Sequence, residues 1–358
     1  MESDPTGNQG WFADMRVFSS DYLRNLGKGL FVACGAPEDE AAIVADELVE
    51  ASLMGLDSHG VMRFAQYVDD AVGGRVRPGA PTRVIKETPT TALVDCGFNF
   101  GPVTATRMAE IACAKAAAAN VACVISQNGH HVGRVGAYVQ KIAARGMFGL
   151  ATCNSSKHGH WVAPWGGREG RLATNPVAYA APTSSDPVVL DMSTAAIAEG
   201  KIRVLMNEGK AVPAESVRDA HGDFVTDPRA FYGPPKGTIL PFGGTQGYKG
   251  FGLSLLTEIL GGIMAGMASS ADHPYVNGLS LIAIDPEAFC GRARFIELMD
   301  DLCTYQTSSL AAHGYSEVVM PGAYDFRMRA KRIVEGIPVA PQTWQQITDT
   351  ARRLNVNV

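Results

Sequence analysis

The sequence lacks three features that would directly indicate a class of protein: a long apolar run, a strongly basic stretch and a cysteine motif. Without an 18-residue apolar run, no transmembrane helix is expected. Charged residues make up only 19% of the chain and the formal net charge is -5. Nucleic-acid binding and attraction to an anionic bilayer both need a basic face. We therefore expect neither nucleic acid nor a membrane as a partner.

The seven cysteines are an odd number, are scattered, and include no Cys-x-x-Cys pair. This usage is typical of buried, reduced thiols. The segment Met1-Glu2-Ser3-Asp4-Pro5 lacks the basic and apolar regions of a secretory signal. We expect a cytoplasmic protein.

The dinucleotide fingerprint Gly-x-Gly-x-x-Gly is missing as well. Gly247, Gly250 and Gly252 give its spacing in reverse, ahead of an apolar stretch that predicts a helix. Glycine amides at a helix N-terminus can bind phosphate, and Lys249 adds a positive charge there. An ordinary glycine-rich turn would have the same residues. The motifs alone therefore do not identify a nucleotide-binding fold.

What is present is enough sequence for two domains, since the chain has 358 residues and is 46% hydrophobic. Apolar periodicity predicts helices at both chain ends, and residues 58–72 are expected to be one of them. Between the ends, strands and helices alternate. We expect one helical domain built from residues 1–80 together with 308–358, and an α+β cofactor-binding domain over residues 81–307.

The central region contains several predicted elements. Residues 251–267 are apolar almost all round, which indicates a buried central helix. Strands are expected at 83–86, 91–95, 121–126, 148–152, 188–192 and 279–284, and further helices at 101–120, 136–145, 194–207 and 286–306.

The first candidate for chemistry is the run that contains Ser58, His59 and Arg63. On a helix, His59 and Arg63 would share one face because they are four residues apart. An arginine binds a carboxylate with two hydrogen bonds, and a histidine can transfer a proton near neutral pH. The alternative is a capping serine beside an exposed His–Arg pair.

The second candidate is the turn with His130 and His131, directly after the predicted strand 121–126. Loops at strand ends favour catalytic groups. His158 and His160 could complete a metal site with these residues, which would make the chain a metal hydrolase. Adjacent histidines point apart, however, and no zinc-ligand spacing completes the set. We expect no metal.

The third group consists of polar turns that could bind a dinucleotide or be plain loops. Asn154 and Ser155 follow one strand, and Thr174 and Asn175 lie further on. Asp191 comes at the end of the apolar run Pro187–Leu190. A carboxylate at that place acts either as a helix cap or as a partner for a histidine or a ribose.

Taken in order, these segments resemble the type 2 malate/L-lactate dehydrogenase family. Ureidoglycolate dehydrogenase, diketogulonate reductase, sulfolactate dehydrogenase and the cyclic-imine reductases are similar too. The resemblance covers residues 20–350 and specifies no substrate. Its motifs are 57–64, His131-x-Gly133, Asn154-Ser155, Trp165-Gly166-Gly167, Thr174-Asn175-Pro176, Asp191-Met192-Ser193-Thr194, Gly200-Lys201, Gly247-Tyr248-Lys249-Gly250 and Met320-Pro321-Gly322.

The resemblance implies an α+β fold without a Rossmann domain: a mixed, largely antiparallel sheet with flanking helices, beside the helical domain. It implies NAD or NADP as cofactor, a small carboxylate as substrate, and a homodimer or higher homo-oligomer. It assigns catalytic or substrate roles to Ser58, His59, Arg63 and His131. The implied cofactor contacts are Asn154, Ser155, Thr174, Asn175, Asp191, Met192, Ser193, Thr194, Tyr248, Lys249 and Gly322.

Two positions depart from the family pattern. His130 stands where the family usually has asparagine, and Ala323 stands where an acid is common after Pro321-Gly322. The expected reaction is hydride transfer to C2 of a 2-oxo acid, with Arg63 on the carboxylate and His59 or His131 as proton donor. We expect these two imidazoles to meet around the nicotinamide. The alternatives are reduction of a cyclic imino acid and a non-catalytic small-molecule binder.

Overall fold

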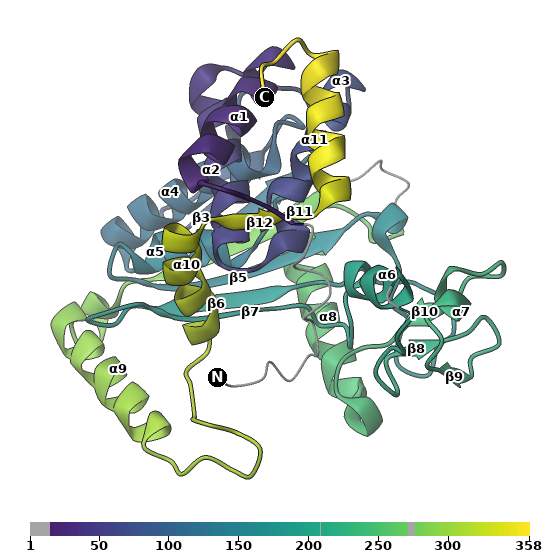
Figure 1. The fold of residues 1–358 in the computed structure, drawn as a ribbon. Helices are drawn as coiled ribbons and strands as arrows, with labels where there is room; N and C mark the ends of the chain where they lie inside the picture. The colour runs from purple at the N-terminus through teal and green to yellow at the C-terminus, as the bar shows by residue number, and fades with distance from the viewer. Residues whose placement is uncertain (1–14, 208, 271–275) are drawn as a thin grey trace. The chain divides into compact units, whose positions relative to one another are not determined.

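The computed structural model describes residues 15–207, 209–270 and 276–358 (Figure 1). The chain divides into two compact units. One ends at Gly79 and resumes at Ala323, and the other is Ala80–Gly322. The second break was predicted at residue 308, whereas in the structure it follows Gly322. The segment before it is tied to the second unit, because Pro321 O accepts a hydrogen bond from Val189 N, 3.0 Å away.

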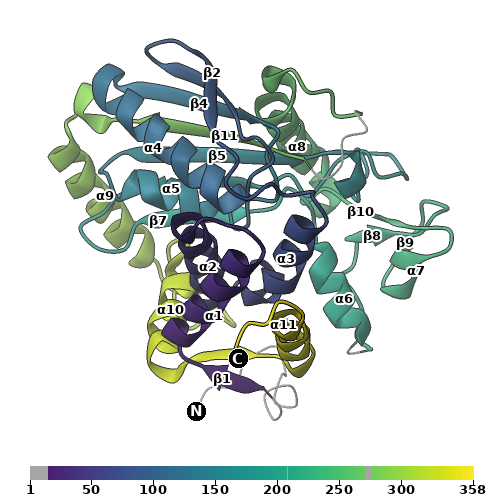
Figure 2. The ribbon, with the colours of Figure 1, turned by 90° about the horizontal axis from the view of Figure 1, so that it is seen from above.

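The first unit is helical, as patterning at the chain ends predicts. It contains α1 (Ser20–Ala33), α2 (Glu38–Leu53), α3 (Phe64–Val72), α10 (Ala323–Glu335) and α11 (Pro341–Arg353). Strand β1 (Arg16–Phe18) pairs antiparallel with β12 (Ile337–Val339), so segments from the first and last parts of the described chain lie side by side (Figure 2). This pairing was not predicted, since three-residue strands leave almost no periodicity to read.

The second unit is built on a seven-stranded mixed sheet in the order β2-β3-β4-β11-β5-β6-β7. Only the β3–β4 pair is parallel, so the predicted largely antiparallel sheet is confirmed. The strands are β2 (Arg83–Glu87), β3 (Thr91–Asp95), β4 (Val121–Gln127), β5 (Phe148–Ser155), β6 (Val177–Ala181), β7 (Val188–Met192) and β11 (Asn277–Ile284). Of these, β6 was not predicted.

Helices cover both faces of this sheet. Helices α4 (Gly101–Ala119) and α5 (Gly136–Ala143) lie on one side and α8 (Tyr248–Gly261) on the other (Figure 1). The expectation of a wholly buried helix over 251–267 is wrong. The helix ends at Gly261, and Ile259, Ile263 and Met264 are 46–57% exposed. A helix that is apolar on all sides can bury one side against its own chain and another side against a partner subunit.

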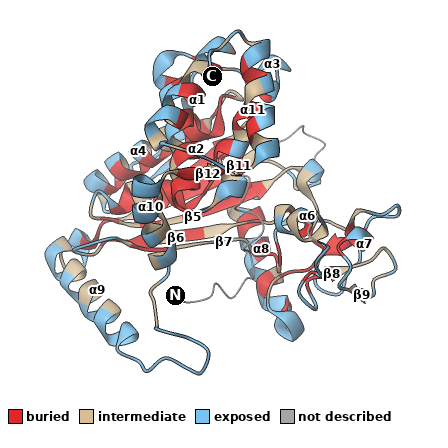
Figure 3. Ribbon diagram, in the orientation of Figure 1, coloured by how far each residue is buried: buried red, intermediate tan, exposed pale blue. Residues whose placement is uncertain are grey.

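Two other helices begin later than predicted. Helix α6 (Glu199–Asn207) starts after Thr194, because that residue is hydrogen bonded to the 174–175 turn instead of to a helix. Helix α9 (Arg292–Thr307) starts after Gly291, whose φ is +82°. Helix α9 contains no buried residue, as Figure 3 shows.

A smaller three-stranded sheet forms a second core in the same unit, in the order β10-β8-β9. Its strands are β8 (Val217–Arg218), β9 (Phe224–Val225) and β10 (Thr238–Ile239), flanked by α6 and α7 (Arg229–Tyr232). Val217, Phe231 and Ile239 are 0–1% exposed at its centre. Among the described residues, none of the helices has the length and apolar character needed to cross a bilayer.

Candidate active site

The segment with His59 is not the continuous helix that the sequence predicts. Two 3₁₀ turns, Asp57–His59 and Val61–Arg63, precede α3. Gly60 separates them in an extended conformation, with φ −96° and ψ −148°. The argument that His59 and Arg63 share one helix face is therefore wrong.

Ser58 joins the two residues instead. Its Oγ lies 2.9 Å from Nδ1 of His59, and its carbonyl oxygen accepts a hydrogen bond of 2.7 Å from Nε of Arg63. The Arg63 guanidinium also donates to Gln66. His59 and Arg63 are both half-buried, so each keeps a solvent-facing part that a substrate can reach.

Contacts within the helical unit hold this segment in place. Asp57 is paired with Arg332 through two hydrogen bonds of 2.7 and 3.1 Å. Ser52, which is fully buried, accepts a hydrogen bond of 3.0 Å from Val61 N. A Cβ on Gly60 would lie 2.0 Å from Ser52 Oγ, so only glycine fits at this approach.

His131 lies in the second unit, in the turn between β4 and α5. Gly129 O accepts from Asn277 N at 3.0 Å, which extends the sheet into the turn. Gly101 packs against the other side, where a Cβ would lie 2.1 Å from the His131 carbonyl oxygen. His131 itself is half-buried, whereas His130 is 3% exposed. The histidine that departs from the family pattern is thus in the core.

Asp191 connects this turn to strand β7. Its Oδ2 accepts a hydrogen bond of 2.7 Å from Gly136 N, the first residue of α5. The carboxylate therefore satisfies an unpaired N–H at the helix N-terminus, where a negative charge is also favourable. Gly322, with φ +89°, lies beside the same strand: a Cβ there would be 3.0 Å from Val189 O.

Thr174, Asn175 and Thr194 form a second connected group. Thr194 N donates to Thr174 O at 2.9 Å, and Thr194 Oγ1 donates to Asn175 O at 3.0 Å. Asn175 has a φ of +41° and is 0% exposed. The 174–175 turn is thus held against the segment that follows β7.

Glu258 of α8 lies at the centre of this region, is 3% exposed and was not predicted as a site residue. Its carboxylate accepts from Asn175 Nδ2 at 2.8 Å, Asn154 Nδ2 at 3.1 Å and Ser269 Oγ at 2.6 Å. Asn154 Oδ1 in turn accepts from Gly278 N at 3.1 Å. The available signal was an acid within an otherwise apolar run, since Glu258 is the one charged residue in 251–267.

The remaining predicted residues lie at the ends of β5 and β7 and at the start of α8. Met192 and Ser193 are half-buried at the end of β7, and Ser155 O lies 3.3 Å from Nε2 of His160. Burial lowers the pKa of His160. Tyr248 is 53% exposed and packs edge-on against Trp165, with ring centroids 6.4 Å apart. Lys249 Nζ lies 5.9 Å from the Tyr248 ring centroid.

The hydrogen bonds thus bring together segments that are far apart in sequence. The His131 turn, the end of β7, the 174–175 turn, Asn154 and Pro321-Gly322 are joined within one unit. Ser58, His59 and Arg63 lie in the other unit. Across the described residues, no group of three His, Cys, Asp or Glu side chains is arranged to hold a metal ion.

Comparison with known proteins matches the same segments to one family. The profile described as malate/L-lactate dehydrogenase matches residues 18–348. The chain belongs to the malate/L-lactate dehydrogenase family. The resemblance deduced from the motifs is confirmed, and the chain is an enzyme of this dehydrogenase family.

Its relatives differ in the substrate that they are named for. The chain is 35% identical to a malate dehydrogenase of Pyrococcus horikoshii over 90% of this chain and 91% of the relative. It is 33% identical to an L-sulfolactate dehydrogenase of Methanocaldococcus jannaschii, over 90% and 93%. The structure of a Δ1-piperideine-2-carboxylate reductase from Pseudomonas syringae superposes with a TM-score of 0.81 at 28% identity, over 94% and 100% of the two chains.

Proposed function

We propose that the protein transfers a hydride between NAD or NADP and a small 2-oxo or 2-hydroxy acid of the malate or lactate type. The observation that carries this proposal is the Asp191–Gly136 hydrogen bond. It ties the strand end implied in cofactor binding to the turn that presents His131. Family membership supports the same reaction class.

The chemistry of the joined segments fits a dinucleotide. Hydroxyl groups of Ser155, Thr174 and Ser193, together with glycine backbone at Gly322, provide neutral hydrogen-bonding groups and close approach. In addition, Asn175 Oδ1 is a buried acceptor with no hydrogen-bond partner in the described structure. The proposed cofactor contacts are Asn154, Ser155, Thr174, Asn175, Asp191, Met192, Ser193, Thr194, Tyr248, Lys249 and Gly322.

In this proposal Asn154 and Asn175 also have a structural role. Their side-chain amide nitrogens both donate to Glu258, which fixes the backbone of the two loops. Ser155 and Thr174, the neighbouring residues, are then presented in a constant position. Glu258 is therefore a positioning residue.

The reactive side chains have distinct roles. When bound, the reduced nicotinamide supplies a hydride to C2 of the substrate. Arg63 binds the substrate carboxylate, and Ser58 orients both Arg63 and His59 through its two contacts. His59 or His131 donates a proton to the developing alkoxide oxygen, and the neutral imidazole accepts that proton in the reverse reaction. An imidazole serves both directions because its ordinary pKa is about 6.5.

A spectrophotometric screen tests the proposal. Oxaloacetate, pyruvate, sulfopyruvate and piperideine-2-carboxylate are each supplied with NADH or NADPH, and loss of the nicotinamide absorbance is followed. Turnover of at least one 2-oxo acid is expected. Absence of turnover with every 2-oxo acid and both cofactors would contradict the proposal. Absence of turnover with piperideine-2-carboxylate as well would favour a non-catalytic binder.

Reduction of a cyclic imino acid is a second candidate. It is favoured by the similarity to the Pseudomonas syringae reductase, which covers 94% of this chain. The same screen separates the two, because an imino-acid reductase would oxidise the cofactor faster with piperideine-2-carboxylate than with any 2-oxo acid.

We also propose a homodimer or higher homo-oligomer. Helix α8 presents Leu253, Leu255, Leu256 and Ile259 at 38–46% exposure, and α9 has no buried residue. Exposed apolar side chains gathered on one helix mark an association surface. Light scattering after gel filtration should give at least twice the 37.9 kDa chain mass. A single-chain mass would contradict this proposal.

A further inference from the structure

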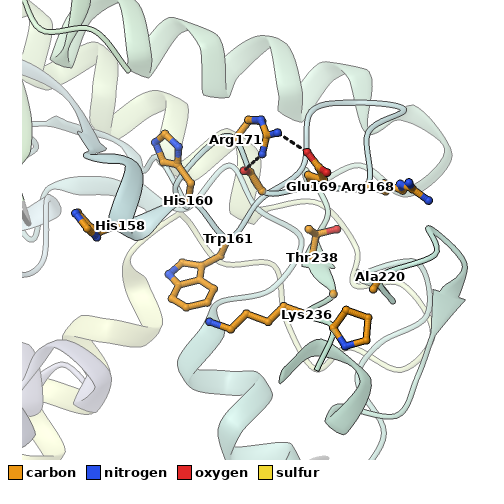
Figure 4. Close-up of a pocket in the computed structure, with 12 residues that line it drawn as sticks. His158, His160, Trp161, Arg168, Glu169, Arg171, Ala220, Lys236 and Thr238 are labelled. Carbon is orange, nitrogen blue, oxygen red and sulfur yellow. Dashed lines mark hydrogen bonds and ion pairs between the residues drawn. The ribbon is translucent and has the colours of Figure 1, made fainter. Parts of the chain in front are cut away.

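A cavity of about 660 Å³ lies in the second unit, beside the small sheet, and the proposed function uses none of the residues around it (Figure 4). This volume is within the usual range for small-molecule sites. The lining side chains that can bind a ligand through charge, hydrogen bonds or an aromatic ring include His158, His160, Trp161, Arg168, Lys236 and Thr238. The wall thus combines cations, an indole ring and a hydroxyl.

The cavity carries positive charge in a chain whose net charge is -5. Of its four charged lining residues, Arg171 and Glu169 neutralise each other in an ion pair. Lys236 Nζ lies 5.1 Å from the Trp161 ring centroid, and Figure 4 shows its side chain running past that ring. Arg168 pairs with no carboxylate in the described chain. Arg168 and Lys236 are therefore both available to an anion.

Thr238 provides an independent sign of a missing ligand. It lies on β10, is 3% exposed and lines the cavity. Its Oγ1 has no hydrogen-bond partner among the described residues. A buried hydroxyl is normally satisfied, and leaving it unpaired is destabilising. The cavity wall thus contains a hydroxyl whose hydrogen-bonding capacity no described residue uses.

We propose that this cavity binds the phosphate group of a small molecule. Guanidinium and ammonium groups form charge-assisted hydrogen bonds with phosphate oxygens, so the two cations of the cavity wall favour a phosphate monoester over a neutral ligand. The phosphate could belong to a free effector or be the ribose 2′-phosphate of NADP. In the first case the site is separate from the proposed hydride transfer, and in the second it sets the cofactor preference.

Titration calorimetry with AMP, with adenosine as the unphosphorylated control, tests the site without any turnover. AMP should bind and adenosine should not. The double variant R168A/K236A should weaken AMP binding about tenfold or more, because two charge-assisted contacts are lost. The control R83A/K86A removes the same charge from exposed residues of β2 and should change AMP affinity less than twofold.

Thr238→Val gives a sharper test, because its effects on stability and on binding have opposite signs. Without ligand, removal of an unsatisfied buried hydroxyl should leave the melting temperature unchanged or raise it. AMP binding should nevertheless weaken about fivefold or more. Equal AMP affinity in R168A/K236A and R83A/K86A, or no binding of AMP, inorganic phosphate or NADP at millimolar concentration, would overturn the proposal.

The source of the phosphate follows from competition. If AMP binds equally well with saturating NADH present, the site takes a free phosphate compound. If AMP competes with NADP, and R168A/K236A weakens NADP but not NAD, the site takes the 2′-phosphate. Both results support the phosphate site. Failure of the dehydrogenase screen would leave these binding results unaffected.

Discussion

The two segments that carry the candidate acid–base histidines are held in different ways. His131 follows a strand of the seven-stranded sheet, and its carbonyl oxygen packs against the backbone of Gly101 on α4. His59 lies between two 3₁₀ turns, and its neighbour Gly60 packs against the Ser52 side chain. The tightest glycine contact beside His131 is thus with backbone, whereas the tightest one beside His59 is with a side chain.

This difference indicates how far each imidazole can move. A backbone contact in a close-packed core has no rotamer to change, whereas a serine hydroxyl can turn away. We therefore expect His131 to have a more constant position than His59, and changes near His131 to be tolerated less. The following predictions test this contrast.

The largest effect is expected from the imidazoles themselves. His131→Asn and His59→Asn should each keep cofactor affinity, and loss of the proton donor should lower turnover by about 10²–10⁴-fold. Stopped-flow or steady-state assays measure this, with His221→Asn, an exposed histidine, as the control. If neither substitution lowers turnover tenfold, the acid–base assignment is wrong.

The second-largest effect on activity is expected from Arg63→Ala. Loss of a charge-assisted contact to the substrate carboxylate should raise KM about 10–100-fold, with a smaller change in kcat. Arg63→Lys should recover part of this, because it keeps the charge but not the two-pronged geometry. Arg83→Ala, at an exposed position, is the control. A normal KM in R63A would contradict the role of Arg63 as carboxylate ligand.

The glycine contacts test the contrast directly. Gly101→Ala should destabilise the protein by about 1–3 kcal/mol through overpacking, and should lower turnover by displacing His131. Gly60→Ala should be relieved in part by Ser52→Gly, since the clashing group is a side chain. Gly200→Ala meets no atom within 4 Å and serves as the control. Denaturant titration gives the unfolding free energy of each variant, and steady-state assays give its kcat. Equal losses in Gly60→Ala and Gly101→Ala would contradict the proposed difference between the two histidine segments.

The smallest effect is expected for Ser52→Ala. It leaves the buried Val61 N–H without its acceptor, at a cost of about 1–2 kcal/mol in unfolding free energy. Turnover should fall less than in any histidine variant. If S52A abolishes turnover while stability is unchanged, Ser52 has a role beyond support of the His59 segment.

The sequence was sufficient for most of the regular elements. Alternation in 91–95 predicted β3 with correct bounds, because every second side chain of that strand is buried, and the apolar run 188–192 predicted β7 with correct bounds. Helix starts were predicted less well. Asn207 was correctly predicted as the end of α6. The start of α6 was predicted five residues too early, because Thr194 is hydrogen bonded to the distant Thr174 and is not part of the helix.

The site was predicted as a set of motifs rather than as an arrangement. His131 and Asp191 were singled out, but the hydrogen bond between Asp191 and Gly136 spans 55 positions and leaves no local pattern. Glu258 was missed for the same reason: its partners Asn154 and Asn175 come from other strands and turns. The cavity beside Trp161 depends on Thr238 and Lys236, which are also distant in sequence.

The pairing of β1 with β12 has a consequence for the order of folding during synthesis. Residues 16–18 can pair with residues 337–339 only after these have left the ribosome. The sheet unit, by contrast, is one continuous segment of the sequence, Ala80–Gly322. Domains generally fold as units while the chain emerges. The sheet unit should therefore form first, and the N-terminal helices wait, incompletely covered, for the last part of the chain.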